Sequence, residues 1–134
     1  MRIVTADTRR STTTPNGTMT TLASPTLGGA RHPLWVVDMN PGVEGPVHAF
    51  EDEVVWAVTD GAGSVRVDGI ESAFAAGDTL VLAAGEPRRF SAGPEGFRAV
   101  VTTSAPGRVS RGDGGDGGDG DGDGEEAVVP DWVA

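Results

Sequence analysis

Short runs of β-branched and other apolar residues, each bounded by Gly, Pro, Asn or Asp, occupy most of the chain from Leu34 onward. The five runs are LWVVDM (34–39), EVVWAVTD (53–60), GSVRVDG (63–69), GDTLVLAA (77–84) and FRAVVTTS (97–104). Strands of this length, repeatedly interrupted by turn residues, are typical of an all-β sandwich or barrel. No segment shows a convincing 3.6-residue apolar period, so the pattern does not favour helices.

The composition divides the 134 residues into four parts. Residues 31–107 hold the strand-like runs and form the predicted barrel. Residues 1–30 are rich in Thr, Ser, Pro and Gly around one apolar run at 18–23, and we expect an N-terminal arm that could add a strand to a neighbouring copy of the chain. Residues 108–126 are a glycine and aspartate tract with almost nothing to bury, which predicts disorder. Residues 127–134 form an apolar C-terminal tail.

The composition also excludes several classes of function. With no cysteine, the chain has no disulfide, no thiolate metal site and no cysteine nucleophile. The formal net charge of -10 argues against a nucleic-acid partner, because phosphate contacts need a clustered positive surface. The first residues lack the apolar run of a secretory signal, and no segment approaches the roughly 18 apolar residues of a membrane span. We therefore expect a cytoplasmic protein without a membrane partner.

Two glycine-bracketed segments in the β region have regular spacing. The first runs Gly42, five residues, His48, one residue, Phe50, three residues, Val54, six residues, Gly61. The second runs Gly77, five residues, Ala83, one residue, Gly85, two residues, Arg88, three residues, Ala92. These spacings resemble, without a gap, the two motifs of the cupin superfamily, G-x5-H-x-H-x3-E-x6-G and G-x5-P-x-G-x2-H-x3-N. The resemblance implies a single small cupin barrel of the double-stranded β-helix or jelly-roll type.

In that family a metal is held by the two histidines and the glutamate of the first motif and by the histidine of the second. The matching positions here are His48, Phe50, Val54 and Arg88, so one imidazole donor remains. Transition-metal sites need about three or four converging donors, and a guanidinium repels a cation. We therefore expect neither a metal nor another cofactor. Glu53 lies one residue before the glutamate position, and strand alternation turns it outward unless a bulge reverses the register.

The same alternation predicts the lining of the barrel cavity. We expect it to include two catalytic candidates, His48 and Arg88, and five substrate-binding candidates, Phe50, Val54, Trp56, Leu82 and Phe90. Such a cavity would suit a small-molecule ligand that is apolar or aromatic in body and carries one anionic or enolisable oxygen. In the alternative interpretation, Arg88 lies at the barrel rim beside Arg89 and is merely hydrated.

Two roles are open for His48. It is a general acid or base, because an ordinary imidazole pKa of about 6.5 allows proton exchange at neutral pH, or it is an inert core histidine, because the sequence shows no carboxylate to orient it.

Small cupins resembling this chain act as polyketide cyclases, isomerases and epimerases. The resemblance implies a metal-independent enzyme of specialised metabolism that works by proton transfer on a small, largely apolar molecule. A non-catalytic small-molecule binding or sensing module is the alternative. A metal-dependent cupin dioxygenase or isomerase with rearranged ligands is the third hypothesis. Small cupins commonly pair through sheet edges, so we also expect a homodimer.

Overall fold

The structure, a computed structural model, describes residues 1–112 and 127–134. Within these ranges the chain is all-β, as the sequence predicts, with one short 3-10 helix, η1 (Ala6–Thr8), and no α-helix. The strands are β1 (Arg10–Thr14), β2 (Gly17–Ala23), β3 (Leu34–Met39), β4 (His48–Phe50), β5 (Val54–Val67), β6 (Ile70–Ala75), β7 (Thr79–Leu82), β8 (Arg89–Thr102) and β9 (Val109–Arg111). In the described part of the chain, no helix is long and apolar enough to cross a membrane.

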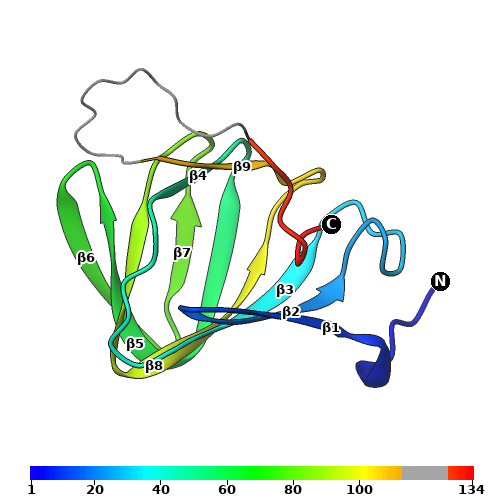
Figure 1. The fold of residues 1–134 in the computed structure, drawn as a ribbon, viewed down its shortest axis with the longest axis horizontal. Helices are drawn as coiled ribbons and strands as arrows, with labels where there is room; N and C mark the ends of the chain where they lie inside the picture. The colour runs from blue at the N-terminus through cyan, green and yellow to red at the C-terminus, as the bar shows by residue number, and fades with distance from the viewer. Residues whose placement is uncertain (113–126) are drawn as a thin grey trace.

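Seven of these strands form one antiparallel sheet that curls into the barrel (Figure 1). The strand order is β1-β2-β3-β8-β5-β6, and β7 pairs with the first part of β5. The short strands β4 and β9 form a separate antiparallel pair. In Figure 1 this pair lies across one end of the barrel, so that residues of the first motif approach the barrel opening.

The long strand pair β5–β8 is strongly bent. Trp56 pairs with Val101, whereas Phe90 pairs with Val65, nine residues farther along β5. A straight strand would separate those positions by about 30 Å. The ring centroids of Trp56 and Phe90 nevertheless lie 4.2 Å apart. The two halves of the strand pair therefore face one another across the core, and the register shifts in β5 between residues 58 and 63 provide the bend.

Gly61 makes this bend possible. The sequence predicts two separate runs on either side of Gly61, at 53–60 and 63–69, but β5 continues through this glycine. Gly61 has φ +75°, and a side chain there would collide with the carbonyl oxygen of Gly96 on β8. The residue thus allows a close approach of two backbones rather than a chain reversal. The remaining glycines of the two motifs also have positive φ: Gly42, Gly77 and Gly85.

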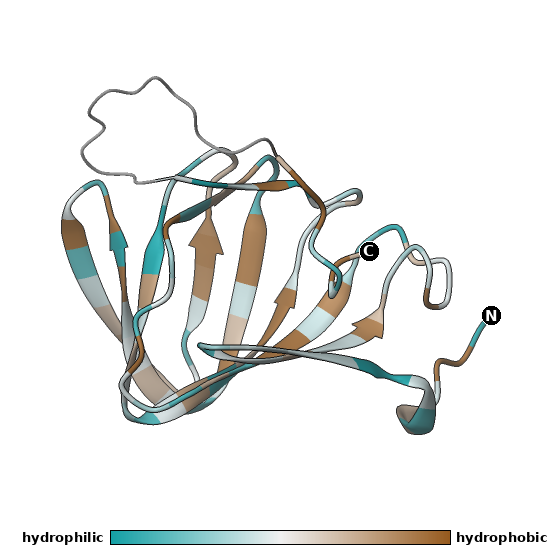
Figure 2. Ribbon diagram, in the orientation of Figure 1, coloured by the Kyte–Doolittle hydropathy of each residue, from teal (hydrophilic) through white to brown (hydrophobic). Residues whose placement is uncertain are grey.

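A single hydrophobic core fills the barrel. Its aromatic members are Trp35, Phe50, Trp56, Phe74, Phe90 and Phe97. Figure 2 shows apolar residues along β7 and the strands beside it, whereas the hairpin β1–β2 is polar over most of its length. The burial pattern of β5 alternates at Val54, Trp56 and Val58, while Glu53 is exposed. The alternation predicted for the first motif is therefore confirmed, and no bulge turns Glu53 inward.

Both ends of the described chain join the barrel, which changes the predicted boundaries. The N-terminal arm contains a hairpin, β1–β2, that extends the main sheet through pairing of β2 with β3. The sequence assigns Val109–Arg111 to the disordered tract, and this is wrong, because the segment pairs with β4 as β9. The rest of that predicted tract, residues 113–126, lies outside the described residues.

Candidate functional site

The barrel encloses a cavity of about 480 Å³. Five of the seven site residues predicted from sequence line it: His48, Phe50, Trp56, Arg88 and Phe90. Strand β3 adds Trp35, Val37 and Met39. A cavity of a few hundred Å³ with mostly apolar walls and a few polar groups is the usual form of a small-molecule site.

Val54 and Leu82, the other two predicted substrate-binding residues, do not line the cavity. They lie opposite one another in the β5–β7 register and are 0% and 4% exposed. Alternation correctly predicts that both point inward, but at this level of the barrel the interior is filled by core side chains. The prediction that Val54 and Leu82 line the cavity is therefore corrected: both pack in the hydrophobic core.

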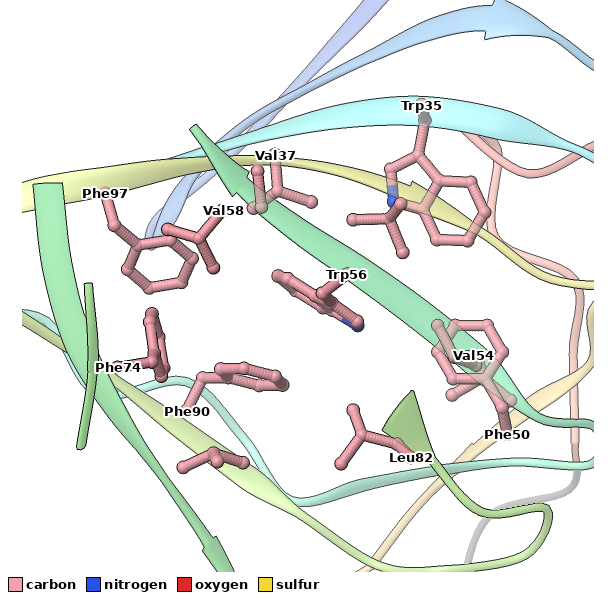
Figure 3. Close-up of a cluster of buried hydrophobic side chains, with 14 of the residues drawn as sticks. Trp35, Val37, Phe50, Val54, Trp56, Val58, Phe74, Leu82, Phe90 and Phe97 are labelled. Carbon is pink, nitrogen blue, oxygen red and sulfur yellow. The ribbon is translucent and has the colours of Figure 1, made fainter. Parts of the chain in front are cut away.

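Aromatic rings form much of the cavity wall (Figure 3). Trp56 stacks on Phe90 with an interplanar angle of 23°, and Trp35 stacks on Phe50 with centroids 6.2 Å apart. Figure 3 shows Trp56 in the middle of the view, with Phe90 on one side and Trp35 and Phe50 on the other. Offset or nearly parallel ring pairs present flat apolar faces, so the cavity suits a ligand with a planar or alicyclic body.

Arg88 is buried in this wall, and its guanidinium is only partly hydrogen-bonded to the described residues. The residue is 3% exposed. Its Nη1 donates a hydrogen bond to the carbonyl oxygen of Glu86 at 3.1 Å, and its guanidinium carbon lies 4.9 Å from the centroid of the Phe50 ring. Its Nη2 has no hydrogen-bond partner among the described residues. Burial lowers the pKa of Arg88 to about 10, with Glu86 opposing the shift, so the guanidinium stays charged at neutral pH.

Arg89, the next residue, occupies the rim position that the alternative interpretation gave to Arg88. It is exposed, its Nη2 lies 3.4 Å from Glu44 Oε1, and its Nε donates to the carbonyl oxygen of Gly45 at 3.0 Å. Successive residues of a strand point to opposite faces, so Arg88 and Phe90 turn inward while Arg89 turns to solvent. The hydrated-rim interpretation therefore describes Arg89 and not Arg88.

Trp56 supplies a second unpaired donor. The residue is 8% exposed, and its Nε1 is buried without a partner among the described residues. A buried donor that gives up water without gaining a partner costs about 1–3 kcal/mol. Trp56 and Arg88 line the same cavity, so acceptor atoms of a molecule bound there are candidate partners for the two nitrogens.

His48 lies beside Arg88 because their backbones pair. The His48 N–H donates to the Arg88 carbonyl at 2.9 Å, and the Arg88 N–H donates to the His48 carbonyl at 2.8 Å. On the other side, β4 pairs His48 with Arg111 of β9. Burial lowers the pKa of His48 to about 4, and the charges of Arg88 and then Arg111 contribute to the shift. The imidazole is therefore neutral at pH values near 7.

The residues at the family's metal-ligand positions do not fit a metal ion. Phe50 stacks under the guanidinium of Arg88, Val54 lies in the core, and only His48 offers a donor. In the described ranges, no group of three or more His, Asp or Glu side chains is arranged to hold a metal. A buried cationic side chain at one of the four positions opposes metal binding electrostatically.

Several parts of the cavity wall are not predicted by the sequence analysis. The β1–β2 hairpin contributes Thr14 to Gly17 and Met19, and the C-terminal end of the chain contributes Val128, Pro130 and Trp132. Arg111 of β9 also lines the cavity. The sequence signal for these contacts is the short apolar tail with Trp132, because apolar residues and a tryptophan in such a segment favour packing against another surface.

Solved structures resemble the chain in fold. The polyketide cyclase RemF from Streptomyces resistomycificus has a TM-score of 0.68 at 21% identity, over 80% of this chain and 81% of the cyclase chain. Salicylate 1,2-dioxygenase from Pseudoaminobacter salicylatoxidans, in a structure with gentisate, has a TM-score of 0.66 at 21% identity, over 76% of this chain and 30% of the dioxygenase chain. For the DMSP lyase DddQ from Ruegeria pomeroyi DSS-3, the TM-score is 0.64 at 17% identity, over 75% of this chain and 58% of the lyase chain.

These similarities confirm that the chain has the cupin fold, which the spacing of the two motifs predicts. The chain spans about a third of the dioxygenase and somewhat more than half of the lyase. No protein-family model matches the sequence, and no curated protein matches it. Because proteins of one fold catalyse many different reactions, the similarity identifies the architecture only. The function has to be inferred from the residues of the site.

Replacing His48 with Gln should reduce the loss of stability on acidification. A histidine whose pKa is lowered by folding binds a proton more readily in the unfolded chain than in the folded one. The contribution of His48 to the free energy of unfolding therefore falls as the pH drops from about 6.5 to about 4, and below that range this contribution is constant. This contribution is on the order of 2–3 kcal/mol, allowing for partial solvent screening. Urea unfolding near the two ends of this pH range measures it. His32→Gln, at an exposed histidine, is the control, and an equal acid-induced loss in His48→Gln and wild type would contradict the assignment.

Proposed function

We propose that this cupin-fold protein binds a small, largely apolar molecule that carries an anionic oxygen, and that it does so without a metal. The observation that carries the proposal is Arg88, a residue of the mostly apolar cavity wall whose Nη2 is buried and has no hydrogen-bond partner among the described residues. A buried unpaired charge is costly, and an anion bound against it removes that cost. Binding would therefore stabilise the folded protein.

The wall around Arg88 defines the rest of the ligand. Trp56 Nε1 is a neutral donor suited to a second acceptor oxygen or a second lone pair of the same group. The faces of Trp56, Phe90 and Trp35 favour an aromatic or alicyclic body. A carboxylate, phenolate or enolate on a ring system meets both requirements, because a guanidinium binds such oxygens with strong charge-assisted hydrogen bonds.

Proton transfer on the bound molecule is the chemistry that the site supports best. The neutral imidazole of His48 can accept a proton from a carbon acid while Arg88 stabilises the resulting enolate oxygen. A bound anion also offsets the charge of Arg88, which contributes to the low pKa of His48, and so makes the imidazole a stronger base. Isomerisation, cyclisation and epimerisation all use such a step, and the fold similarity to a polyketide cyclase is compatible with it.

A non-catalytic binding or sensing module is the second candidate. The pKa of about 4 makes His48 a weak base in the empty site, and Arg88 would hold an anionic ligand equally well without turnover. A metal-dependent dioxygenase or isomerase has no support from the residues, since Arg88 replaces one of the ligands and Phe50 and Val54 replace two others.

Arg88→Met should weaken the binding of aromatic carboxylates at least ten-fold while leaving the free protein stable. We expect 1-naphthoate to raise the melting temperature of the wild-type protein and its Kd to increase at least ten-fold in the variant, since a charge-assisted hydrogen bond is lost. Unfolding of the ligand-free variant should require as much urea as wild type, or more, because the buried charge is gone. Arg89→Met is the matched control and should bind as wild type. Unchanged binding in Arg88→Met would refute the proposal.

Deuterium exchange separates the enzyme from the binding module. A carbon acid that stabilises the protein should incorporate deuterium from D2O at its acidic carbon, as followed by NMR. His48→Gln should lower that rate about 100-fold or more while thermal stabilisation by the ligand persists. If wild-type protein binds such molecules without accelerating their exchange, the binding module is the correct function.

A further inference from the structure

The C-terminal segment, residues 127–134, forms part of the cavity wall. Val128, Pro130 and Trp132 are all part of the lining. In Figure 1 the segment, coloured red, passes from the β9 end of the barrel toward β3. Strands of the main sheet and the β4–β9 pair supply most of the other lining residues, whereas this segment belongs to neither sheet.

Backbone hydrogen bonds hold this segment at both ends. Val128 exchanges two of them with Val109 of β9, at 2.8 and 2.9 Å. At the other end, the carbonyl oxygen of Ala134 accepts from the N–H and the hydroxyl of Thr26, at 3.1 and 2.8 Å. The segment is therefore attached to the rest of the chain at two separate places, with Pro130 and Trp132 between them.

Packing fixes the position of Trp132 between these attachments. The hydroxyl of Thr21 on β2, a fully buried residue, donates to the Trp132 carbonyl oxygen at 2.8 Å. The next residue, Val133, is 0% exposed and packs so closely on Gly107 that a side chain at Gly107 would collide with it. With its backbone and its neighbour held in this way, the Trp132 indole is directed to the cavity and packs against the edge of the core.

We infer that Trp132 is a ligand-contacting residue that limits the size of the ligand, and that the C-terminal segment completes the binding site. This inference rests on the proposed function, because it assumes that the cavity binds an aromatic or alicyclic anion. Arg88 is buried, whereas Trp132 is only partly buried, and both line the same cavity. With the anionic group of the ligand at Arg88, the body of the ligand would meet the large indole of Trp132, which excludes ring systems that the rest of the wall would accept.

Selectivity between two aromatic carboxylates of different size tests this inference. The Kd values of 1-naphthoate and 9-anthroate are measured by calorimetry on the full chain for wild type, Trp132→Ala and Trp132→Phe. Wild type should prefer 1-naphthoate. In Trp132→Ala the preference should shift toward 9-anthroate by ten-fold or more, while 1-naphthoate itself binds several-fold more weakly because a stacking face is lost. Trp132→Phe should be intermediate, and it serves as the folded variant if the alanine variant unfolds.

Arg88→Met in the same series distinguishes the two possible failures. If wild type binds the probes, Arg88→Met does not, and the ratio of the two Kd values is the same in wild type and both Trp132 variants, the size limit is wrong and the proposed function stands. If neither probe binds to wild type or to any Trp132 variant, the proposed function fails and this inference fails with it. Binding of 9-anthroate only after Trp132 is replaced would support the size limit directly.

Discussion

The stacking of Trp56 on Phe90 requires the long strands β5 and β8 to bend back on themselves, because the two residues belong to opposite halves of the strand pair. That bend needs Gly61, where β5 approaches Gly96 too closely for any side chain. Because of the bend, the two halves of the β5–β8 strand pair face one another and enclose the core. The same arrangement brings the first motif opposite the second. Arg88 lies beside His48 because their backbones exchange two hydrogen bonds.

The residues of the site carry a positive charge where the cupin motif has ligands for a metal cation. The position that supplies a histidine ligand in the cupin motif holds a guanidinium here, stacked on the phenylalanine that replaces another ligand. The cavity therefore carries its own fixed positive charge, and burial together with this charge lowers the pKa of the remaining histidine, His48. Such a cavity is complementary to an anion, and the neighbouring aromatic faces make it complementary to an apolar one.

The sequence predicts the parts of this site that depend on local pattern. Motif spacing and strand alternation correctly place His48, Phe50, Trp56, Arg88 and Phe90 on the cavity wall, and Glu53 outside. The same alternation shows that Val54 and Leu82 point inward, but it has no information on depth within the barrel. The position of the C-terminal segment in the cavity wall depends on contacts such as the hydrogen bond from Thr21 to Trp132. This bond joins residues 111 positions apart in the chain, and no local sequence pattern encodes it. The strand β9 was missed for the same reason, since its partner β4 lies far away in the chain.

A crystal structure of the protein with bound 1-naphthoate tests the central claim most directly. The account predicts a carboxylate oxygen about 3 Å from Arg88 Nη2, with the ring system against Trp56 and Phe90. A metal ion coordinated by His48, or a naphthoate bound elsewhere while Arg88 Nη2 stays unpaired, would contradict it.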